Sequence, residues 1–283
     1  MNMLQAELKD KNVQYCWRYM DFDRYVSLLL NKTMYFSALS SYTDDQFEAM
    51  CDILKLLYET NSSHKDLNTL YNFYKNSEYS RHNDCSYFSS ENKRKSLAIL
   101  FKRFSDSTVV NCWHKNNSQS AAMWNLYSNN VKTAVAIMVP LDNLKSYANI
   151  YGMDFKDIKY INYNDNLPTL YDAATYKRKV YEHEKEIRLI KTINNYGKHI
   201  IDKNGLVIST GGVCHHYPFD FNKMVDAVIV SPYAEKYFAE TVYFLTKKLN
   251  SFDEVYYLDN LVKDIGKFSF EDPKTLIDKI INK

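Results

Sequence analysis

Apolar residues recur along the chain with two different spacings, and these spacings predict both strands and helices. Segments 13–19, 33–37 and 108–114 are short and rich in aromatic or β-branched residues, which is typical of strands. Further strands are expected at 132–139, 156–163, 185–192, 205–209, 224–231 and 254–258. No two of these segments repeat each other's sequence, so a repeat architecture is not indicated.

Helical spacing appears between the predicted strands. A helix is expected from Asp21, as its cap, to residue 31, with Phe22, Tyr25 and Leu29 on one face. Ser118 is a plausible cap for another helix, and Pro140 is expected to lie in the first turn of the next. The other helical patterns fall at 47–57, 67–74, 97–104, 118–129, 234–249 and the last fifteen or so residues.

Together the elements predict an α+β fold: a mixed, twisted or bent sheet core with a helical insertion and peripheral helices. We expect a single main domain, 1–283, because no stretch resembles an interdomain linker. The lysine-, asparagine- and serine-rich block at 45–106 is interpreted as a helical insertion within that domain. It would form a layer over one sheet, a lid or a partner surface.

Composition narrows the function classes. Hydrophobic residues make up 46% and charged residues 25% of the chain, as in ordinary globular proteins. The balance of 36 basic against 34 acidic residues gives no strong field for a purely electrostatic nucleic-acid or membrane binder. With only six glycines, the chain contains neither G-x-G-x-x-G nor a P-loop motif. Any bound nucleotide must therefore be held by other means.

The expected location is a reducing cytoplasm. The longest apolar runs fall far short of the ~20 residues that a membrane-spanning helix needs. The polar, acid-containing N-terminus is unlike a secretory signal. The five cysteines are odd in number and scattered, which does not suggest a disulfide framework.

The most distinctive local feature is the charged segment 182–188. In a strand, Glu182, Glu184, Glu186 and Arg188 would share one face. One interpretation is a solvated edge strand in which Glu186 pairs with Arg188. The other is a carboxylate held at a cleft for sugar chemistry. Arg18, in an otherwise aromatic strand, also needs a partner: a ring, a carboxylate or a phosphate.

Other candidate motifs favour ordinary structural roles. Neither cysteine–histidine cluster, at 112–114 and 214–216, has the ligand spacing of a zinc site, and no metal is expected. Cys112 lies in an apolar strand and is expected to be an inert thiol. The basic runs 93–95 and 177–179 suggest solvated helix faces, although a nucleic-acid surface that uses tyrosine stacking is the alternative.

The ordered motifs resemble the bacterial domain-of-unknown-function family 2971, over about residues 14–260. Where that family usually has Asp-Pro-Phe-Glu, this chain has Asp45-Gln46-Phe47-Glu48, without the proline that sets the helix start. The matching segments are Trp17-Arg18-Tyr19-Met20, Met34-Tyr35-Phe36-Ser37, Ser40-Ser41-Tyr42-Thr43-Asp44, Cys112-Trp113-His114, Ala121-Ala122-Met123-Trp124-Asn125-Leu126-Tyr127, Tyr176-Lys177-Arg178, Glu182-His183-Glu184-Lys185-Glu186-Ile187-Arg188-Leu189 and Val230-Ser231-Pro232-Tyr233.

The order of Arg18, the helix after it and the Glu184-x-Glu186 strand also resembles ADP-ribosyltransferases. That resemblance implies that Glu186 and Glu184 are catalytic. It implies that Arg18, Tyr19 and Arg188 bind NAD, the substrate. The final glutamate would hydrogen-bond the nicotinamide ribose and stabilise the oxocarbenium-like transition state. The family's middle serine or threonine element has no clear match here.

The function expected from this resemblance is that of an NAD-dependent effector or toxin in bacterial defence that modifies a macromolecular acceptor, protein or nucleic acid. The first alternative is a nucleic-acid-binding or nuclease module, which salt-dependent affinity for RNA or DNA would reveal. The second is a noncatalytic interaction or sensor protein that binds the product of a neighbouring gene. We further expect Arg18 and at least one of Glu184 and Glu186 to face one cleft.

Overall fold

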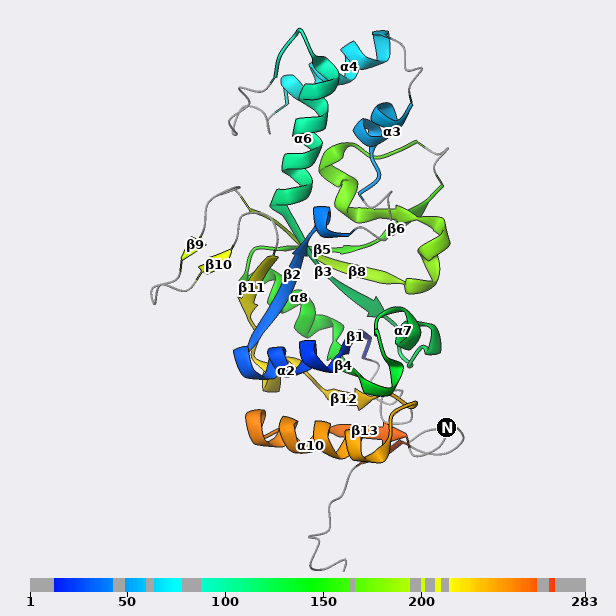
Figure 1. Cartoon of the computed structure of the whole chain (residues 1–283), viewed down its shortest axis with the longest axis vertical. Helices are drawn as coiled ribbons and strands as arrows, with labels where there is room; N and C mark the ends of the chain where they lie inside the picture. The colour runs from blue at the N-terminus through cyan, green and yellow to red at the C-terminus, as the bar shows by residue number, and fades with distance from the viewer. Residues whose placement is uncertain are drawn as a thin grey trace, which may run out of the picture. The chain divides into compact units, whose positions relative to one another are not determined.

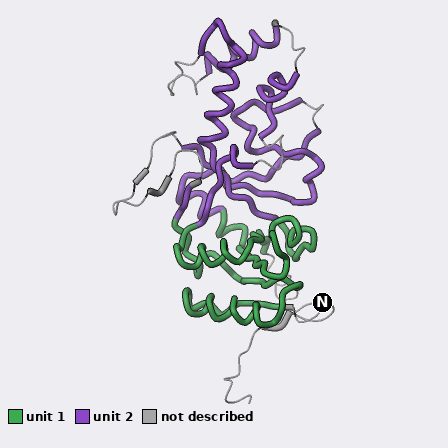
Figure 2. Tube along the Cα trace, viewed as in Figure 1, with its two compact units in different colours: residues 1–33, 115–144, 218–283 green, residues 34–114, 145–217 purple. Residues whose placement is uncertain are grey.

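The structure is a computed structural model, and it describes residues 13–42, 49–59, 64–77, 88–162, 166–193, 200–201, 207–209, 214–258 and 265–267 (Figure 1). The chain divides into two compact units (Figure 2). Unit 1 comprises Met1–Thr33, Lys115–Leu144 and Pro218–Lys283, and unit 2 comprises Met34–His114 and Lys145–Tyr217. Each unit therefore combines segments that are distant in the sequence.

The described residues of unit 1 contain five neighbouring strands. Strand β4 (Ala134–Pro140) lies between β1 (Tyr15–Asp21) and β12 (Ala227–Val230), and it is antiparallel to both. Next to β12 come β13 (Val255–Leu258), which is parallel to it, and then β14 (Ile265–Lys267), which is antiparallel to β13. The central position of β4 explains why its first six residues are apolar and all buried.

Aromatic side chains join two of the helices of unit 1. Tyr25 and Thr246 join α2 to α10 through a hydrogen bond of 2.6 Å between their hydroxyls. The rings of Phe22 and Phe238 meet edge to face across the same pair of helices. The helices are α2 (Phe22–Asn31), α7 (Ala121–Leu126), η2 (Val131–Thr133), α9 (Phe221–Met224) and α10 (Lys236–Asn250). A core cluster of Tyr15, Trp17, Tyr19, Met123, Trp124, Ala134, Ala136, Met138, Ala227 and Ile229 lies within this unit.

The strands of unit 2 are built around β3 (Thr108–Lys115) and β8 (Glu186–Thr192), which pair antiparallel. Strand β2 (Thr33–Ala38) pairs with β3, and β5 (Asp154–Asp157) pairs with the other edge of β8. Strand β8 is therefore an interior strand. The shorter strands are β6 (Lys159–Ile161), β7 (Tyr176–Arg178), β9 (Ile200–Ile201), β10 (Val207–Ser209) and β11 (Cys214–Pro218), of which β6 and β7 form a separate parallel pair.

Helices α3 (Asp52–Tyr58) and α4 (His64–Lys75) pack against the long helix α6 (Lys93–Ser107), which leads directly into β3 (Figure 1). The remaining helices are η1 (Leu39–Ser41), η3 (Leu170–Thr175), η4 (Lys179–Glu184) and α8 (Leu141–Ile150), which runs from unit 1 into unit 2. The core of unit 2 comprises Leu39, Ala49, Cys51, Ile53, Leu56, Tyr74, Leu97, Leu100, Phe104, Val110, Leu170, Ala173, Ala174 and Ile190.

These elements confirm the α+β class with a mixed, largely antiparallel sheet. That the chain forms a single domain with an insertion at 45–106 stays a prediction. The described part of this block is helical apart from short loops. No described helix combines the length and apolar character that crossing a bilayer demands. The closing helix expected near the C-terminus lies outside the described residues.

Several expected boundaries were wrong for local reasons. Ser120, rather than Ser118, caps α7, because its hydroxyl accepts a hydrogen bond from the Met123 backbone N–H. Pro140 ends β4 instead of lying in the next helix, which begins at Leu141. The strand expected at 156–163 is divided into β5 and β6, with Ile158 between them.

Candidate functional site

Four charged side chains of unit 2 converge in a group that we call the carboxylate cluster: Lys177, Glu184, Glu186 and Arg188. The Lys177 ammonium Nζ lies 2.6 Å from Glu184 Oε2 and 3.3 Å from Glu186 Oε2. Arg188 holds Glu186 with two hydrogen bonds, Nε to Oε1 at 2.6 Å and Nη2 to Oε2 at 3.2 Å. Two carboxylates and two cations therefore balance one another.

A turn in the backbone brings the two glutamates together. Helix η4 ends at Glu184, and Lys185 then adopts a left-handed conformation with φ 42°. Strand β8 begins only at Glu186, so the expected strand face that was to include Glu182 and Glu184 does not form. Glu182 is exposed on η4 instead. The expectation was wrong because a period of two applies only within a strand.

The carboxylate cluster is also not a solvated edge. Glu186 is 4% and Arg188 1% exposed, and β8 has a strand on each side. The pairing of Glu186 with Arg188, expected for an edge strand, does occur, but it is buried. Arg188 Nη1 makes a further hydrogen bond of 3.0 Å to the Ala174 carbonyl. Buried charges tolerate such a position only when they are paired in this way.

The local charges determine the protonation of Glu186. Burial by itself raises the pKa of this carboxyl, but the neighbouring Arg188 and Lys177 outweigh it and lower the pKa to about 2. Burial lowers the pKa of the Lys177 ammonium, and the two carboxylates more than compensate, so that its pKa is raised. At neutral pH Glu186 is thus a carboxylate, which excludes a role as general acid.

Cys112, on β3, adjoins this cluster. Its thiol donates to Glu186, and its sulfur lies 3.5 Å from the Tyr42 hydroxyl. Burial, reinforced by the Glu186 charge, raises the pKa of the thiol to about 12. Cys112 is therefore a neutral thiol near pH 7 and a poor nucleophile. The Tyr160 hydroxyl completes the surroundings by accepting a hydrogen bond of 2.7 Å from the Glu186 backbone N–H.

The two glutamates differ in how their oxygens are used. Both carboxylate oxygens of Glu186 accept hydrogen bonds from Arg188, and Oε2 also accepts from Lys177. Glu184 accepts from Lys177 through Oε2, whereas its Oε1 accepts no hydrogen bond from the described residues. The backbone carbonyl of Glu184 binds His114 Nδ1, which fixes the main chain at this point.

Lys177 was not among the candidate site residues. The basic run 177–179 was expected on a solvated helix face, and that expectation was wrong for Lys177, which is buried on strand β7. Its ammonium also lies over the Tyr181 ring, 4.7 Å from the centroid. The adjacent Arg178 donates to the Tyr181 hydroxyl at 3.1 Å. The one sequence signal for this pairing was the group of glutamates that follows at 182–186.

Arg18 and Tyr19 lie in unit 1, on β1. Arg18 is half-buried and pairs in register with Ile137. Tyr19 is buried; its hydroxyl accepts a hydrogen bond of 3.1 Å from the Ser120 N–H, and its ring meets Trp124 edge to face. The structure thus brings Glu184, Glu186 and Arg188 together with Lys177. A cleft that includes Arg18 stays a prediction.

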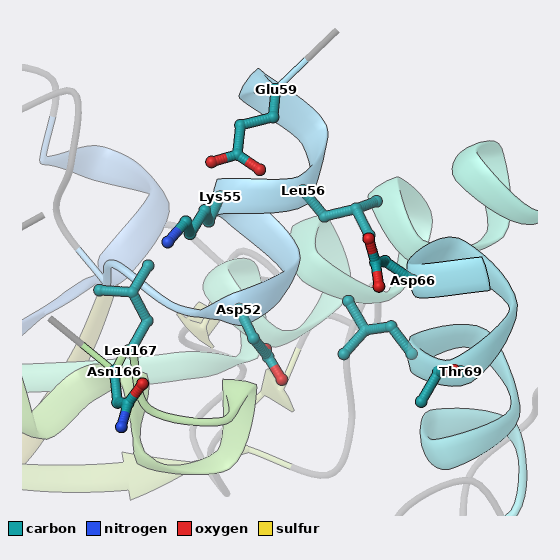
Figure 3. A pocket seen from close by; sticks show the side chains of 9 residues that line it. Asp52, Lys55, Leu56, Glu59, Asp66, Thr69, Asn166 and Leu167 are labelled. Carbon is teal, nitrogen blue, oxygen red and sulfur yellow. The ribbon is translucent and has the colours of Figure 1, made fainter. Parts of the chain in front are cut away.

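Unit 2 also contains a cavity of about 320 Å³ between α3, α4 and the segment before η3 (Figure 3). Its lining comprises Asp52, Lys55, Leu56, Glu59, Asp66, Thr69, Leu70, Asn166 and Leu167. Burial raises the pKa of Asp52, whose Oδ1 accepts hydrogen bonds of 2.7 Å from the Tyr74 hydroxyl and the Ile53 N–H. The described lining shares no residue with the carboxylate cluster.

No group of three or more histidine, cysteine, aspartate or glutamate side chains in the described part of the chain is arranged to hold a metal ion. Comparison of the sequence with protein-family models and with curated proteins, and of the fold with solved structures, gave no match. The class that fold and site define is thus an α+β protein with a buried, charge-balanced carboxylate cluster.

Proposed function

We propose that this chain is an NAD-dependent ADP-ribosyltransferase-like protein whose carboxylate cluster contacts the nicotinamide ribose. The observation that carries the proposal is the convergence of Glu184 and Glu186, the two glutamates of the Glu-x-Glu motif, on one ammonium group. The motif resembles the one that the transferases use, and here its two carboxylates lie together at the start of a strand.

The charge state of the cluster supports this chemistry. When the glycosidic bond to nicotinamide breaks, positive charge develops on the ribose, and an ionised carboxylate beside it lowers the barrier. The low pKa of Glu186 keeps this carboxylate ionised at every physiological pH. The reaction would move the ADP-ribosyl group from nicotinamide to a nucleophile of a macromolecular acceptor, and the acceptor's proton would leave to solvent.

The test is release of nicotinamide from NAD by the purified chain, with and without cell extract as the source of acceptor. We expect release together with labelling of a macromolecule by NAD that carries a label in its adenylate part. The double variant Glu184→Gln/Glu186→Gln should lose release by at least about 100-fold, the usual cost of removing a preorganised electrostatic group.

Glu182→Gln is the matched control, because Glu182 is exposed two residues before Glu184 and, among the described residues, no hydrogen bond or ion pair joins its side chain to the cluster. It should release nicotinamide at the wild-type rate. Absence of release by the wild-type chain with every extract, or equal release by the double variant, would refute the proposal. Salt-dependent binding of RNA or DNA without NAD turnover would favour the nucleic-acid alternative instead.

A further inference from the structure

We propose that Glu184 is the carboxylate that contacts the ligand, and that Glu186 is a positioning residue that acts on it through Lys177. This inference rests on the proposed function, and it exchanges the two roles that the resemblance implies, in which the second glutamate of the pair contacts the ribose. It follows from which carboxylate oxygens are already occupied and from the order in which the charged groups are connected.

Glu186 has no capacity left for a ligand. A carboxylate offers about four lone-pair positions to hydrogen-bond donors. Arg188 occupies two of them, at 2.6 and 3.2 Å, and Lys177 occupies a third at 3.3 Å. The Cys112 thiol donates to the same carboxylate. A ribose hydroxyl that approached Glu186 would have to displace one of these donors inside a buried site.

Glu184 has the capacity that Glu186 lacks. Its Oε2 is engaged by Lys177 at 2.6 Å, but its Oε1 accepts no hydrogen bond from the described residues. The side chain keeps 6% of its surface exposed, against 3% for Glu186. The open oxygen lies on the last residue of helix η4, immediately before the left-handed Lys185. A ligand hydroxyl that reached Oε1 would therefore displace no hydrogen bond from the described residues.

Lys177 connects the two carboxylates. Its ammonium bridges them and lies over the Tyr181 ring, so it has little freedom to move. Arg188 is anchored on the Ala174 carbonyl and holds Glu186 in place. Glu186 in turn orients the Lys177 ammonium, and the ammonium orients Glu184. In this arrangement the bidentate ion pair is the support, and the single charge-assisted hydrogen bond to Glu184 orients the reacting group.

The first experiment needs no enzymatic activity. Coupling of glycinamide to carboxylates by a water-soluble carbodiimide, followed by tryptic digestion, reports which side chains solvent reaches. Trypsin cuts after Lys185, so Glu182 and Glu184 appear in one peptide and Glu186 in the next. We expect Glu182 to be labelled fast, Glu184 slowly and Glu186 not at all. We also expect saturating NAD to protect Glu184 while leaving Glu182 unaffected.

The second experiment compares single variants in the nicotinamide release assay. Glu184→Gln should lower kcat about 100-fold with little change in melting temperature, because it removes the contacting charge. Glu186→Gln should lower the melting temperature, and its kcat should fall only about 10-fold, with an unchanged KM for NAD. Glu186→Asp, which keeps the charge, should restore most of that kcat. Glu182→Gln remains the control.

The outcomes separate the inference from the proposed function. Labelling of Glu186 at least as fast as Glu184 overturns the inference, whether or not the chain turns over NAD. So does a greater loss of kcat in a folded Glu186→Gln variant than in Glu184→Gln. Absence of nicotinamide release by the wild-type chain refutes the proposed function alone, and the labelling order then still decides which carboxylate is open to a ligand. Should Glu186→Gln fail to fold, labelling of the wild-type protein decides by itself.

Discussion

Removal of Arg188 should destabilise the protein strongly, because it leaves buried negative charge uncompensated. In the wild type the cluster contains two carboxylates and two cations, and Arg188 is 1% exposed. Arg188→Met keeps most of the side-chain volume and leaves Glu184 and Glu186 with Lys177 as the single cation. Breaking a buried ion pair from one side costs about 3–5 kcal/mol. The melting temperature should fall by roughly 10 °C.

The second variant in the series tests the cause of that loss. Arg188→Met/Glu186→Gln restores the charge balance, because Lys177 and Glu184 remain as one pair at 2.6 Å. The double variant should therefore be more stable than Arg188→Met alone by at least about 1 kcal/mol, and the coupling energy of the cycle, which adds the cost of Glu186→Gln, should be larger still. If Arg188→Met destabilised the protein only by loss of packing, the double variant would be less stable than Arg188→Met.

Urea unfolding of wild type, both single variants and the double variant gives the four free energies of this cycle. Arg24→Met is the matched control, because Arg24 is exposed on α2 and the change should stay within about 0.5 kcal/mol. Additive effects of the two cluster mutations would refute the charge argument. So would an Arg188→Met variant as stable as the control, since then the guanidinium contributes nothing.

Two further predictions concern other buried groups. The pKa of Glu186 is lowered from an ordinary 4.5 to about 2, which stabilises the folded state by about 3 kcal/mol. This part of the free energy of unfolding should be present above pH 4.5 and lost as the pH falls toward 2. Acid unfolding of the Glu186→Gln variant should lack that loss. Tyr74→Phe should cost about 1–3 kcal/mol in urea unfolding, because the Tyr74 hydroxyl donates to Asp52 and accepts from the Leu170 N–H, each at 2.7 Å, whereas exposed Tyr237→Phe should be neutral.

Local patterns were sufficient to predict much of the fold. The strand expected at 13–19 is β1, displaced by two residues, and the helix expected from Asp21 to 31 is α2. Both show in the local spacing of their apolar residues, which periodicity records directly, although β1 also pairs with the distant strand β4. The pairing of Glu186 with Arg188 was also within reach, because residues two apart in a strand share a face.

The rest of the cluster depends on contacts that no local pattern records. Lys177 meets both glutamates across helix η4, and the left-handed Lys185 turns the chain between Glu184 and Glu186. The interior position of β8 depends on pairing with β3 and β5, which come from distant parts of the sequence. A short basic run most often indicates solvent exposure, so the pattern at 177–179 did not predict that Lys177 would be buried.

The oxygens of the cluster bear on whether it is structural or functional. Buried ion pairs are costly to desolvate, and hydrophobic side chains of the same volume often give equal or greater stability. A cluster that served stability alone would be expected to engage all its acceptors internally, since each hydrogen bond to a charged group adds stability. Here three of the four carboxylate oxygens accept internal hydrogen bonds and Glu184 Oε1 accepts none from the described residues. That asymmetry is what a rigid support with one open acceptor requires, and it directs attention to Glu184.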